Sequence, residues 1–301
     1  MTVLPVIASV SGGKDSTAMC LHLREREINY TPVFIDTGWE SEQTYNYIEN
    51  TLPEIIGEIT TIVKVIDLPD DVEQIARSFE DRMGRYSPMI RRILKYGSFP
   101  SRKARWCTVD LKVDTMKRHI SKIDEDVVNA VGIRAEESSS RSQMGEWEYS
   151  TSYQCEVWRP IIGWTLQDVI DIHHRHGVAP CSLYLKGASR VGCWPCIYAR
   201  KAEIRRIGDS DPERIALIRD LEEAVAPIAA KRRRAAGKPK QNAPAWFQAR
   251  TGRSGACWPI DKVVSWSRTA ARRVNQFEMF APTSRDSGCM RWGLCDTGAD
   301  Q

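Results

Sequence analysis

A glycine-containing loop near the amino terminus has the composition of a phosphate-binding site. It follows an apolar run at residues 3–10 and precedes a segment of helical character at 17–26. A strand that turns through glycines into a helix points backbone N–H groups and the positive helix end at one spot, which suits a pyrophosphate. The lysine supplies a point charge, the hydroxyls bind oxygen atoms, and the aspartate is suited to orient the loop or to help hold Mg²⁺. The loop residues are Ser11, Gly12, Gly13, Lys14, Asp15 and Ser16.

The order of these residues separates the loop from other phosphate sites. Only two glycines precede Lys14, so the loop is not of the GxxxxGK[ST] type. It matches the PP-loop, the signature of enzymes that cleave a nucleotide at its α-phosphate, and the simpler alternative is a plain glycine turn. Cleavage requires that the phosphate charge be neutralised and that ribose and base be held. Asp36, at the end of the next expected strand, is placed for the ribose or the adenine.

The pattern of elements predicts a doubly wound α/β fold with a parallel sheet. Runs that read as strands lie at residues 3–10, 31–38, 60–66 and 127–133. Helical segments alternate with them, at 17–26 and at 41–51, where Ser41 is the expected N-cap. Such sheets carry helices on both faces and bind ligands at the carboxyl ends of their strands. Three polar segments fall at these ends, at 11–16, 36–40 and 134–141.

Length and composition bound the organisation of the chain. Its 301 residues allow one large domain with an appendage. We expect a nucleotide-binding domain at residues 1–205 and a basic, mainly helical, cysteine-containing extension at 206–301. No apolar run approaches the roughly 20 residues of a membrane span, and no leader pattern is present, so a cytoplasmic protein is expected. Nine cysteines in a reducing compartment indicate metal or redox chemistry and not a disulfide framework.

Positive charge is concentrated toward the carboxyl terminus. Residues 198–273 hold 18 Lys and Arg against 8 Asp and Glu, although the whole chain carries only +4. The densest run, 231–240, is either a contact surface for nucleic-acid phosphates or a solvated linker. Tryptophans of the extension either stack on the bases of an unwound strand or bury against a neighbouring domain. They are Trp246, Trp258, Trp266 and Trp292.

Four further segments agree with the loop in order and spacing. They are Asp-Thr-Gly at 36–38, Arg-Trp-Cys-Thr-Val-Asp-Leu-Lys at 105–112, Gly-Ile-Arg-Ala-Glu-Glu-Ser at 132–138 with Arg141, and Arg-Val-Gly-Cys-Trp-Pro-Cys at 190–196. With the loop, they give the chain a resemblance to the phosphoadenosine phosphosulfate (PAPS) reductase family of the adenine nucleotide α-hydrolase-like fold. The resemblance covers roughly residues 1–205 and implies that the chain binds ATP or PAPS with Mg²⁺.

The resemblance also implies roles for particular residues. Lys112, Arg134 and Arg141 would contact the phosphates or the sulfate of the nucleotide. The catalytic set would be Lys14, Asp15, Ser16, Lys112 and Arg134. Nucleotide contacts beyond the loop would come from Asp36, Gly38, Gly132, Arg134, Glu137, Ser138 and Arg141. Without the resemblance, the charged residues at 134–137 read as an ordinary surface cluster of ion pairs.

The family divides by chemistry, and this chain departs from one branch. Sulfonucleotide reductases carry a Glu-Cys-Gly-(Ile/Leu)-His motif near the carboxyl terminus, and the nearest string here is Gly-Leu-Cys-Asp-Thr at 293–297. The Gly-Cys-Trp-Pro-Cys segment at 192–196 is similar instead to the ATP pyrophosphatases of DNA phosphorothioation, which contain an iron–sulfur cluster. That likeness implies adenylylation of an oxygen on nucleic acid, followed by its displacement by sulfur from a donor such as a cysteine desulfurase.

The cysteine spacing predicts where a cluster would be held. A Cys-x-x-Cys pair supplies two thiolates, and a closed site needs two more. The expected ligands of a 4Fe–4S cluster, or of zinc as the alternative, are Cys193, Cys196, Cys289 and Cys295. Cys107 and Cys181 compete for the last two places, and a redox pair is a further alternative. His173, His174 and His176 lie at an expected helix end, where polar side chains suit the negative terminus better than a metal.

Three functions follow from these observations. The first is an ATP-consuming, iron–sulfur enzyme that transfers sulfur to nucleic acid. The second is a PAPS or adenylyl-sulfate reductase that produces sulfite. The third is a non-catalytic nucleotide-binding module of a DNA-modification assembly.

Overall fold

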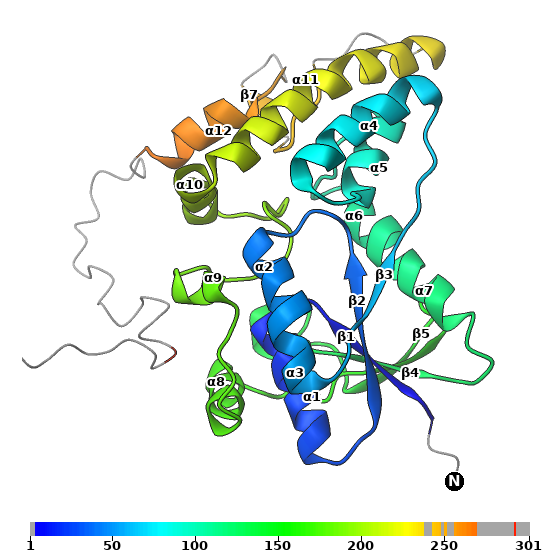
Figure 1. Ribbon diagram of the computed structural model, residues 1–301, viewed down its shortest axis with the longest axis vertical. Coiled ribbons are helices and arrows are strands. Elements are labelled where there is room, and N and C mark those ends of the chain that lie inside the picture. Colours follow the sequence, from blue (N-terminus) through cyan, green and yellow to red (C-terminus); the bar gives the residue numbers. More distant parts are fainter. Residues whose placement is uncertain (1–3, 238–242, 248–249, 252–255, 270–291, 293–301) are drawn as a thin grey trace, which may run out of the picture.

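The computed structural model describes residues 4–237, 243–247, 250–251, 256–269 and 292. In this part of the chain a six-stranded sheet carries helices on both faces, and a helical layer lies beyond the carboxyl ends of its strands (Figure 1). This arrangement confirms the predicted α/β fold with a helical carboxyl-terminal region. None of the helices described is long and apolar enough to cross a membrane.

The sheet has the strand order β3-β2-β1-β4-β6-β5. Neighbouring strands are parallel except β5, which runs antiparallel to β6 at one edge. Val6 of β1 pairs with Tyr30 of β2 on one side and with Val128 of β4 on the other, so these three strands begin at the same level of the sheet. The strands are β1 (Val6–Val10), β2 (Tyr30–Asp36), β3 (Thr60–Val63), β4 (Val128–Val131), β5 (Trp147–Ser150) and β6 (Cys155–Trp158).

Alternating side chains of β1 supply both faces of the sheet. Val6, Ala8 and Val10 belong to the main hydrophobic core, which also contains buried residues of α1. Ile7 packs on the opposite face, with Met116 and Ile120 of α7. The helices around the sheet are α1 (Lys14–Glu25), α2 (Glu42–Asn46), α3 (Leu52–Ile56), α7 (Asp114–Ile120) and α8 (Leu166–Arg175), with single helical turns at Tyr47–Thr51, Val109–Val113 and Ala135–Glu137. Ser41 is the N-cap of α2, as expected.

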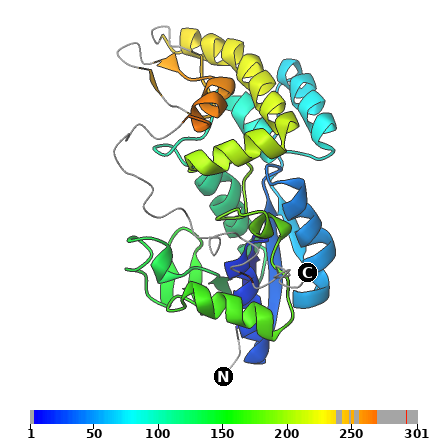
Figure 2. The ribbon, with the colours of Figure 1, turned by 90° about the vertical axis from the view of Figure 1, so that its left-hand side faces the viewer.

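The helical layer combines segments from the middle and the end of the chain (Figures 1 and 2). In it α5 packs on α4 and α11, while α10 and α12 pack on each other and on α11. The elements not yet given are α4 (Asp70–Met83), α5 (Pro88–Tyr96), α6 (Trp106–Thr108), α9 (Ser182–Leu185), α10 (Lys201–Ser210), α11 (Pro212–Ala235), α12 (Ile260–Ser267) and a short hairpin of β7 (Arg250–Thr251) and β8 (Ala256–Cys257).

One hydrophobic core runs from the sheet into the helical layer. It includes Val10 of β1, Ile93 of α5, Leu221 of α11 and Val263 of α12. Residue 205, where a domain boundary is expected, lies inside α10, and the boundary stays a prediction. α11 extends to Ala235, so the start of the basic run forms its last turns. Cations are favourable at that end of a helix because the helix dipole is negative there.

Glu222 of α11 fixes the extension to this core. Its buried carboxylate accepts hydrogen bonds from the backbone N–H groups of Trp246 (2.9 Å) and Ile260 (3.0 Å). Burial nevertheless raises the pKa of Glu222 from its ordinary value of 4.5 to about 7. Since the folded pKa lies above the unfolded one, the group favours folding fully below pH 4.5, and this contribution is lost as the pH rises through 7.

We therefore predict that Glu222→Gln flattens the pH dependence of stability. Between pH 5 and pH 8 the unfolding free energy of the unmodified protein should fall relative to that of the variant by on the order of 3 kcal/mol. Urea unfolding at several pH values measures this difference. Glu223→Gln, at the exposed neighbouring position, is the matched control. Parallel pH profiles for the Glu222 variant and the unmodified chain would contradict the prediction.

Candidate functional site

The PP-loop joins β1 to α1. Ser16 closes the turn, because its hydroxyl donates to the carbonyl oxygen of Gly13 (2.9 Å) and accepts from the N–H of Ser11 (3.2 Å). Gly132, just after β4, comes so near that a Cβ atom there would lie 2.7 Å from the backbone oxygen of Asp15. Only glycine allows this approach, so the end of β4 lies directly against the first turn of α1.

Asp15 pairs with the two cations of this loop region. Its carboxylate receives one hydrogen bond from Lys14 and another from the Nε of Arg134 (2.6 Å). Arg134 is 4% exposed and also pairs with Glu136. The cations that the sequence assigns to phosphate are therefore held together, with one carboxylate between them. A bound polyphosphate would displace the Asp15 carboxylate and pair with Lys14 and Arg134 in its place.

Two aromatic side chains that the sequence analysis left out of the site hold the backbone of Lys14. The hydroxyl of Tyr184 accepts from the Lys14 N–H (3.3 Å), and the Nε2 of the buried His173 lies 3.0 Å from the Lys14 carbonyl oxygen. Trp292 packs against both rings, with ring centroids 5.1 Å from His173 and 6.1 Å from Tyr184. It is 2% exposed. The last described residue of the chain thus supports the PP-loop.

The residues after Arg134 pair with one another. The backbone N–H of Arg134 donates to Glu137 (3.1 Å), and the Arg141 side chain forms an ion pair with the same carboxylate. The Ser138 hydroxyl accepts from the N–H of Arg141 (3.3 Å). Arg141 and Ser138 are therefore near the loop cations through Glu137, but their expected contacts with a nucleotide stay predictions.

The turn after β2 contains two buried carboxylates. Asp36 accepts from the N–H of Gly38 and from the hydroxyl of Tyr45, both at 2.7 Å. That hydroxyl also lies 3.1 Å from Glu40, which is 1% exposed. Burial, and next the negative charge of Glu40, raise the pKa of Asp36. Gly38 has a φ of +63°, and a Cβ there would lie 2.4 Å from Ser87, so only glycine fits.

Glu40 connects this turn to the cysteines. Its backbone forms a bridge with Cys193, and its carboxylate lies 3.7 Å from the Nζ of Lys112. Negative charge at Cys193 is the largest cause that raises the pKa of Lys112. Burial raises the pKa of Cys193 to about 12, while Lys112 opposes that shift. Lys112, expected to contact phosphate or sulfate, therefore lies close to Glu40 and to a thiol. Glu40 belongs to the polar segment at 36–40, but no motif assigned it a role.

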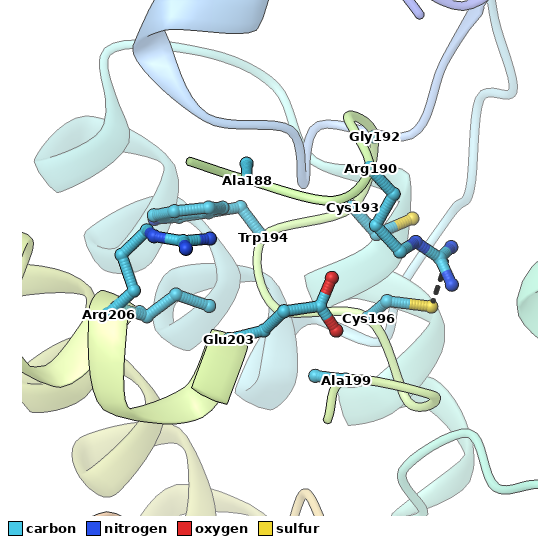
Figure 3. A pocket seen from close by; sticks show the side chains of 10 residues that line it. Ala188, Arg190, Gly192, Cys193, Trp194, Cys196, Ala199, Glu203 and Arg206 are labelled. Carbon is cyan, nitrogen blue, oxygen red and sulfur yellow. Dashed lines mark hydrogen bonds between the residues drawn. The ribbon is translucent and has the colours of Figure 1, made fainter. Parts of the chain in front are cut away.

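Cys107 and Cys196 belong to the same neighbourhood. Burial, and to a smaller extent the charge of Cys196, raise the pKa of Cys107. Arg190 donates to the sulfur of Cys196 at 3.3 Å, and Figure 3 shows the sulfur of Cys193 on the same side of the loop. The cavity beside this loop is lined by both cysteines, by Arg190 and by Glu203 (Figure 3). The contact holds the Cys196 sulfur beside a positive charge.

The described residues do not by themselves complete a metal site. Among them no three side chains of His, Cys, Asp or Glu lie close enough to hold an ion. Cys289 and Cys295 lie outside the described residues, so the four-cysteine set stays a prediction. Cys181, a competing ligand, is buried elsewhere and donates to the backbone oxygen of Gln43 (3.7 Å). Cys107 is the alternative ligand that lies near Cys193 and Cys196.

Trp39 connects the turn after β2 to the extension and to the segment at 190–196, which we call the cysteine loop. Its indole N–H donates to the carbonyl oxygen of Pro195 (3.2 Å), and its own carbonyl oxygen accepts from the N–H of Trp194 (2.8 Å). Its ring stacks on Trp246 with a centroid distance of 4.5 Å. Two of the four tryptophans of the extension, Trp246 and Trp292, are thus buried, whereas Trp266 is 42% exposed.

A comparison with protein families agrees with this arrangement. Residues 5–199 match the phosphoadenosine phosphosulfate reductase domain. The match spans the PP-loop, the turn after β2 and the cysteine loop, and the chain belongs to this family. Adenine-nucleotide binding follows at the level of the family.

Individual relatives place the chain among diverse members. It is 36% identical to an uncharacterized 37.8 kDa protein of Escherichia phage 186, over 73% of this chain and 75% of that protein. It is 27% identical to the adenosine 5'-phosphosulfate reductase of Allochromatium vinosum, over 42% of this chain and 52% of that enzyme. The PAPS reductase structure from Candida auris is 16% identical, with a TM-score of 0.45, over 64% of this chain and 83% of that one.

The pairing of Asp15 yields a test of the nucleotide site. We predict that Asp15→Asn strengthens the binding of inorganic pyrophosphate, because Lys14 and Arg134 lose the carboxylate that pairs with them. A charged hydrogen bond contributes about 1.5–3 kcal/mol, so affinity should rise about tenfold or more. Titration calorimetry without divalent cations measures it, with Asp124→Asn, at an exposed position, as the control. Unchanged or weaker binding in the Asp15 variant would contradict the idea that phosphate displaces the Asp15 carboxylate.

Proposed function

We propose that the protein is an ATP pyrophosphatase that adenylylates an oxygen of a nucleic acid and prepares it for replacement by sulfur. The observation that carries the proposal is the link from the turn after β2 through Glu40 to Lys112 and to Cys193. A nucleotide site and a thiol site that share one buried carboxylate suit a reaction that couples phosphate activation to sulfur chemistry.

Binding of the nucleotide uses the loop and its cations. The N–H groups at the start of α1 and the side chains of Lys14 and Arg134 would receive the polyphosphate. This contact frees the carboxylate of Asp15. Mg²⁺ prefers one or two carboxylates together with substrate phosphates, and the released Asp15 is a fitting ligand. The ion would add charge neutralisation to that of the two side chains.

The chemical step conserves all its atoms. The acceptor oxygen attacks the α-phosphorus, the bond to the bridging oxygen breaks, and pyrophosphate leaves with that oxygen. Sulfur then displaces the adenylylated oxygen, which leaves as AMP. If the donor delivers sulfur as a persulfide, two electrons are required, and Cys193 with Cys196 would supply them by forming a disulfide. Lys112 is placed to stabilise the negative charge of the sulfur.

Cys193 and Cys196 are alternatively suited to hold an iron–sulfur cluster. As cluster ligands they could not form a disulfide, and an external dithiol would then supply the two electrons. Thiolates are the ligands that such clusters and zinc require. Cys193 and Cys196 would supply two, and Cys289, Cys295 or Cys107 the others. The likeness of the segment at 192–196 to the DNA phosphorothioation branch motivates this part of the proposal. A bound cluster would supply redox or structural chemistry at the sulfur site.

A second candidate is a PAPS or adenylyl-sulfate reductase. The family match and the name of the Allochromatium vinosum relative favour it. The string at 293–297 argues against it, because it lacks the glycine and histidine that follow the cysteine in such reductases. A non-catalytic nucleotide-binding module is the third candidate, and it predicts binding without turnover.

Product analysis separates these candidates. We predict that the anaerobically purified protein releases pyrophosphate from ATP and no sulfite from PAPS with a thiol reductant. Lys14→Ala should lower pyrophosphate release about 100-fold or more, since one lost electrostatic donor costs about 10²–10³ in rate. Lys122→Ala, at an exposed lysine of the α7–β4 connection, is the control. Sulfite release would support the reductase, and nucleotide binding without either product the third candidate.

Metal analysis tests the sulfur site. We predict that Cys193→Ser and Cys196→Ser each lose bound iron and sulfide, because a hydroxyl is a poor ligand for these clusters. At least one of Cys289→Ser and Cys295→Ser should do the same. Cys20→Ser, at a fully buried position of α1, is the control. Full iron in both variants of the 193–196 pair would rule out Cys193 and Cys196 as ligands. Full iron in both tail variants would redirect the test to Cys107 and Cys181.

A further inference from the structure

A large cavity lies between the extension and the loop that precedes α6. Its volume is about 730 Å³, within the range of roughly 300–1,000 Å³ that is typical of small-ligand pockets. Its described lining includes Trp246, Phe247, Trp258 and Trp266, together with Arg102 and Lys103. We call it the tryptophan pocket. Neither the family match nor the proposed ATP site accounts for it, since four of these residues lie beyond residue 199.

Aromatic rings form one wall of the tryptophan pocket. The rings of Trp258 and Trp266 lie 6.4 Å apart at 71° to each other. Trp266 is 42% exposed, although an indole of that size is usually covered. An exposed indole at the mouth of a cavity offers a flat surface on which another aromatic ring can stack.

Cations surround these rings. Arg102 and Lys103 line the cavity and are exposed. The Nζ of Lys262 lies 4.9 Å from the ring of Trp258, and that of Lys201 lies 5.0 Å from the ring of Trp266. The described residues that line the pocket include no Asp or Glu. The pocket therefore suits a ligand that combines a flat ring with negative charge, as a nucleotide unit does.

The tryptophan pocket adjoins the cysteine loop. Ala199 lines both this pocket and the cavity beside Cys193 and Cys196. Tyr198 connects them as well, because its N–H donates to the Cys196 sulfur (3.5 Å) and its ring lies 5.5 Å from the guanidinium of Arg102. A ring held in the pocket would thus lie one residue away from the loop that carries the sulfur atoms.

We propose that the tryptophan pocket binds one unpaired base of a single-stranded nucleic acid. The base stacks on Trp266, and the adjoining phosphates pair with Arg102 and Lys103. A single strand is required because the faces of bases in a duplex are already stacked on their neighbours. The inference rests on the proposed nucleic-acid acceptor and adds to it a location and a strand state.

Oligonucleotide binding tests the proposal. The probe is a fluorescein-labelled 12-nucleotide oligothymidylate, and an oligomer with the same backbone and no bases is its partner. Base–aromatic stacking contributes about 1–3 kcal/mol per base, so Trp266→Ala should weaken oligothymidylate binding about 5- to 150-fold. Trp266→Phe, which keeps a stacking face, should restore most of the affinity. The oligomer without bases should bind more weakly and respond to neither variant.

The charge contacts have an independent measurement. The double variant Arg102→Gln/Lys103→Gln should lower the slope of log affinity against log salt by about 1.4, or about 0.7 for each phosphate contact on a single strand. Arg24→Gln/Lys122→Gln removes the same charge from exposed positions outside the pocket lining and should leave the slope unchanged.

Several results would overturn the proposal. The first is equal binding of the two oligomers, and the second is unchanged affinity in Trp266→Ala. The third is a lower mass of Trp266→Ala by light scattering, which would show that the variant weakens binding by disrupting self-association. Pyrophosphate release by the unmodified protein keeps the two proposals apart. If ATP is cleaved while Trp266 has no effect on binding, the pocket assignment fails and the ATP chemistry stands. If Trp266→Ala weakens binding and ATP is not cleaved, the pocket assignment stands and the proposed ATP chemistry fails.

Discussion

The packing of Trp39 is the interaction on which the arrangement of the site depends. This fully buried indole touches the turn after β2, the cysteine loop and the extension at once. Arg214 of α11 covers it, with its guanidinium 4.9 Å from the ring and one N–H donated to the backbone of Glu40. Loss of such a side chain from a core costs about 3–5 kcal/mol. Loss of the Trp39 side chain would also remove its hydrogen bond to Pro195, which holds the cysteine loop next to the turn after β2.

Buried charge follows the same geometry. Asp36 and Glu40 share the hydroxyl of Tyr45, and Glu40 faces Lys112, which in turn faces Cys193. Charges so placed interact more strongly than at the surface, because little water screens them. A change of charge at the sulfur therefore alters the environment of the carboxylates at the end of β2. The two chemistries are coupled through Glu40, which lies outside the recognised motifs, and through Lys112, the last residue of the segment at 105–112.

The sequence predicted the parts of the fold that depend on local pattern. β1, β3 and β4 lie within the expected apolar runs, β2 begins one residue before its expected run, and Ser41 caps α2 as expected. β5 and β6 were not predicted, because Trp147–Ser150 is a mostly exposed edge strand without an apolar run. The PP-loop was recognisable because six adjacent residues carry it. Tyr184, His173 and Glu40 were not, since their contacts with Lys14 and with Lys112 arise only when distant segments meet.

The position of Trp292 bears on how the chain can be shortened. This residue is separated from Lys14 by almost the whole sequence, yet it packs on the two rings that hold the Lys14 backbone. Trp292 consequently supports the PP-loop, and the segment that carries it is not a removable tail. A chain cut before residue 292 would expose His173 and Tyr184 to water and loosen the loop that they support.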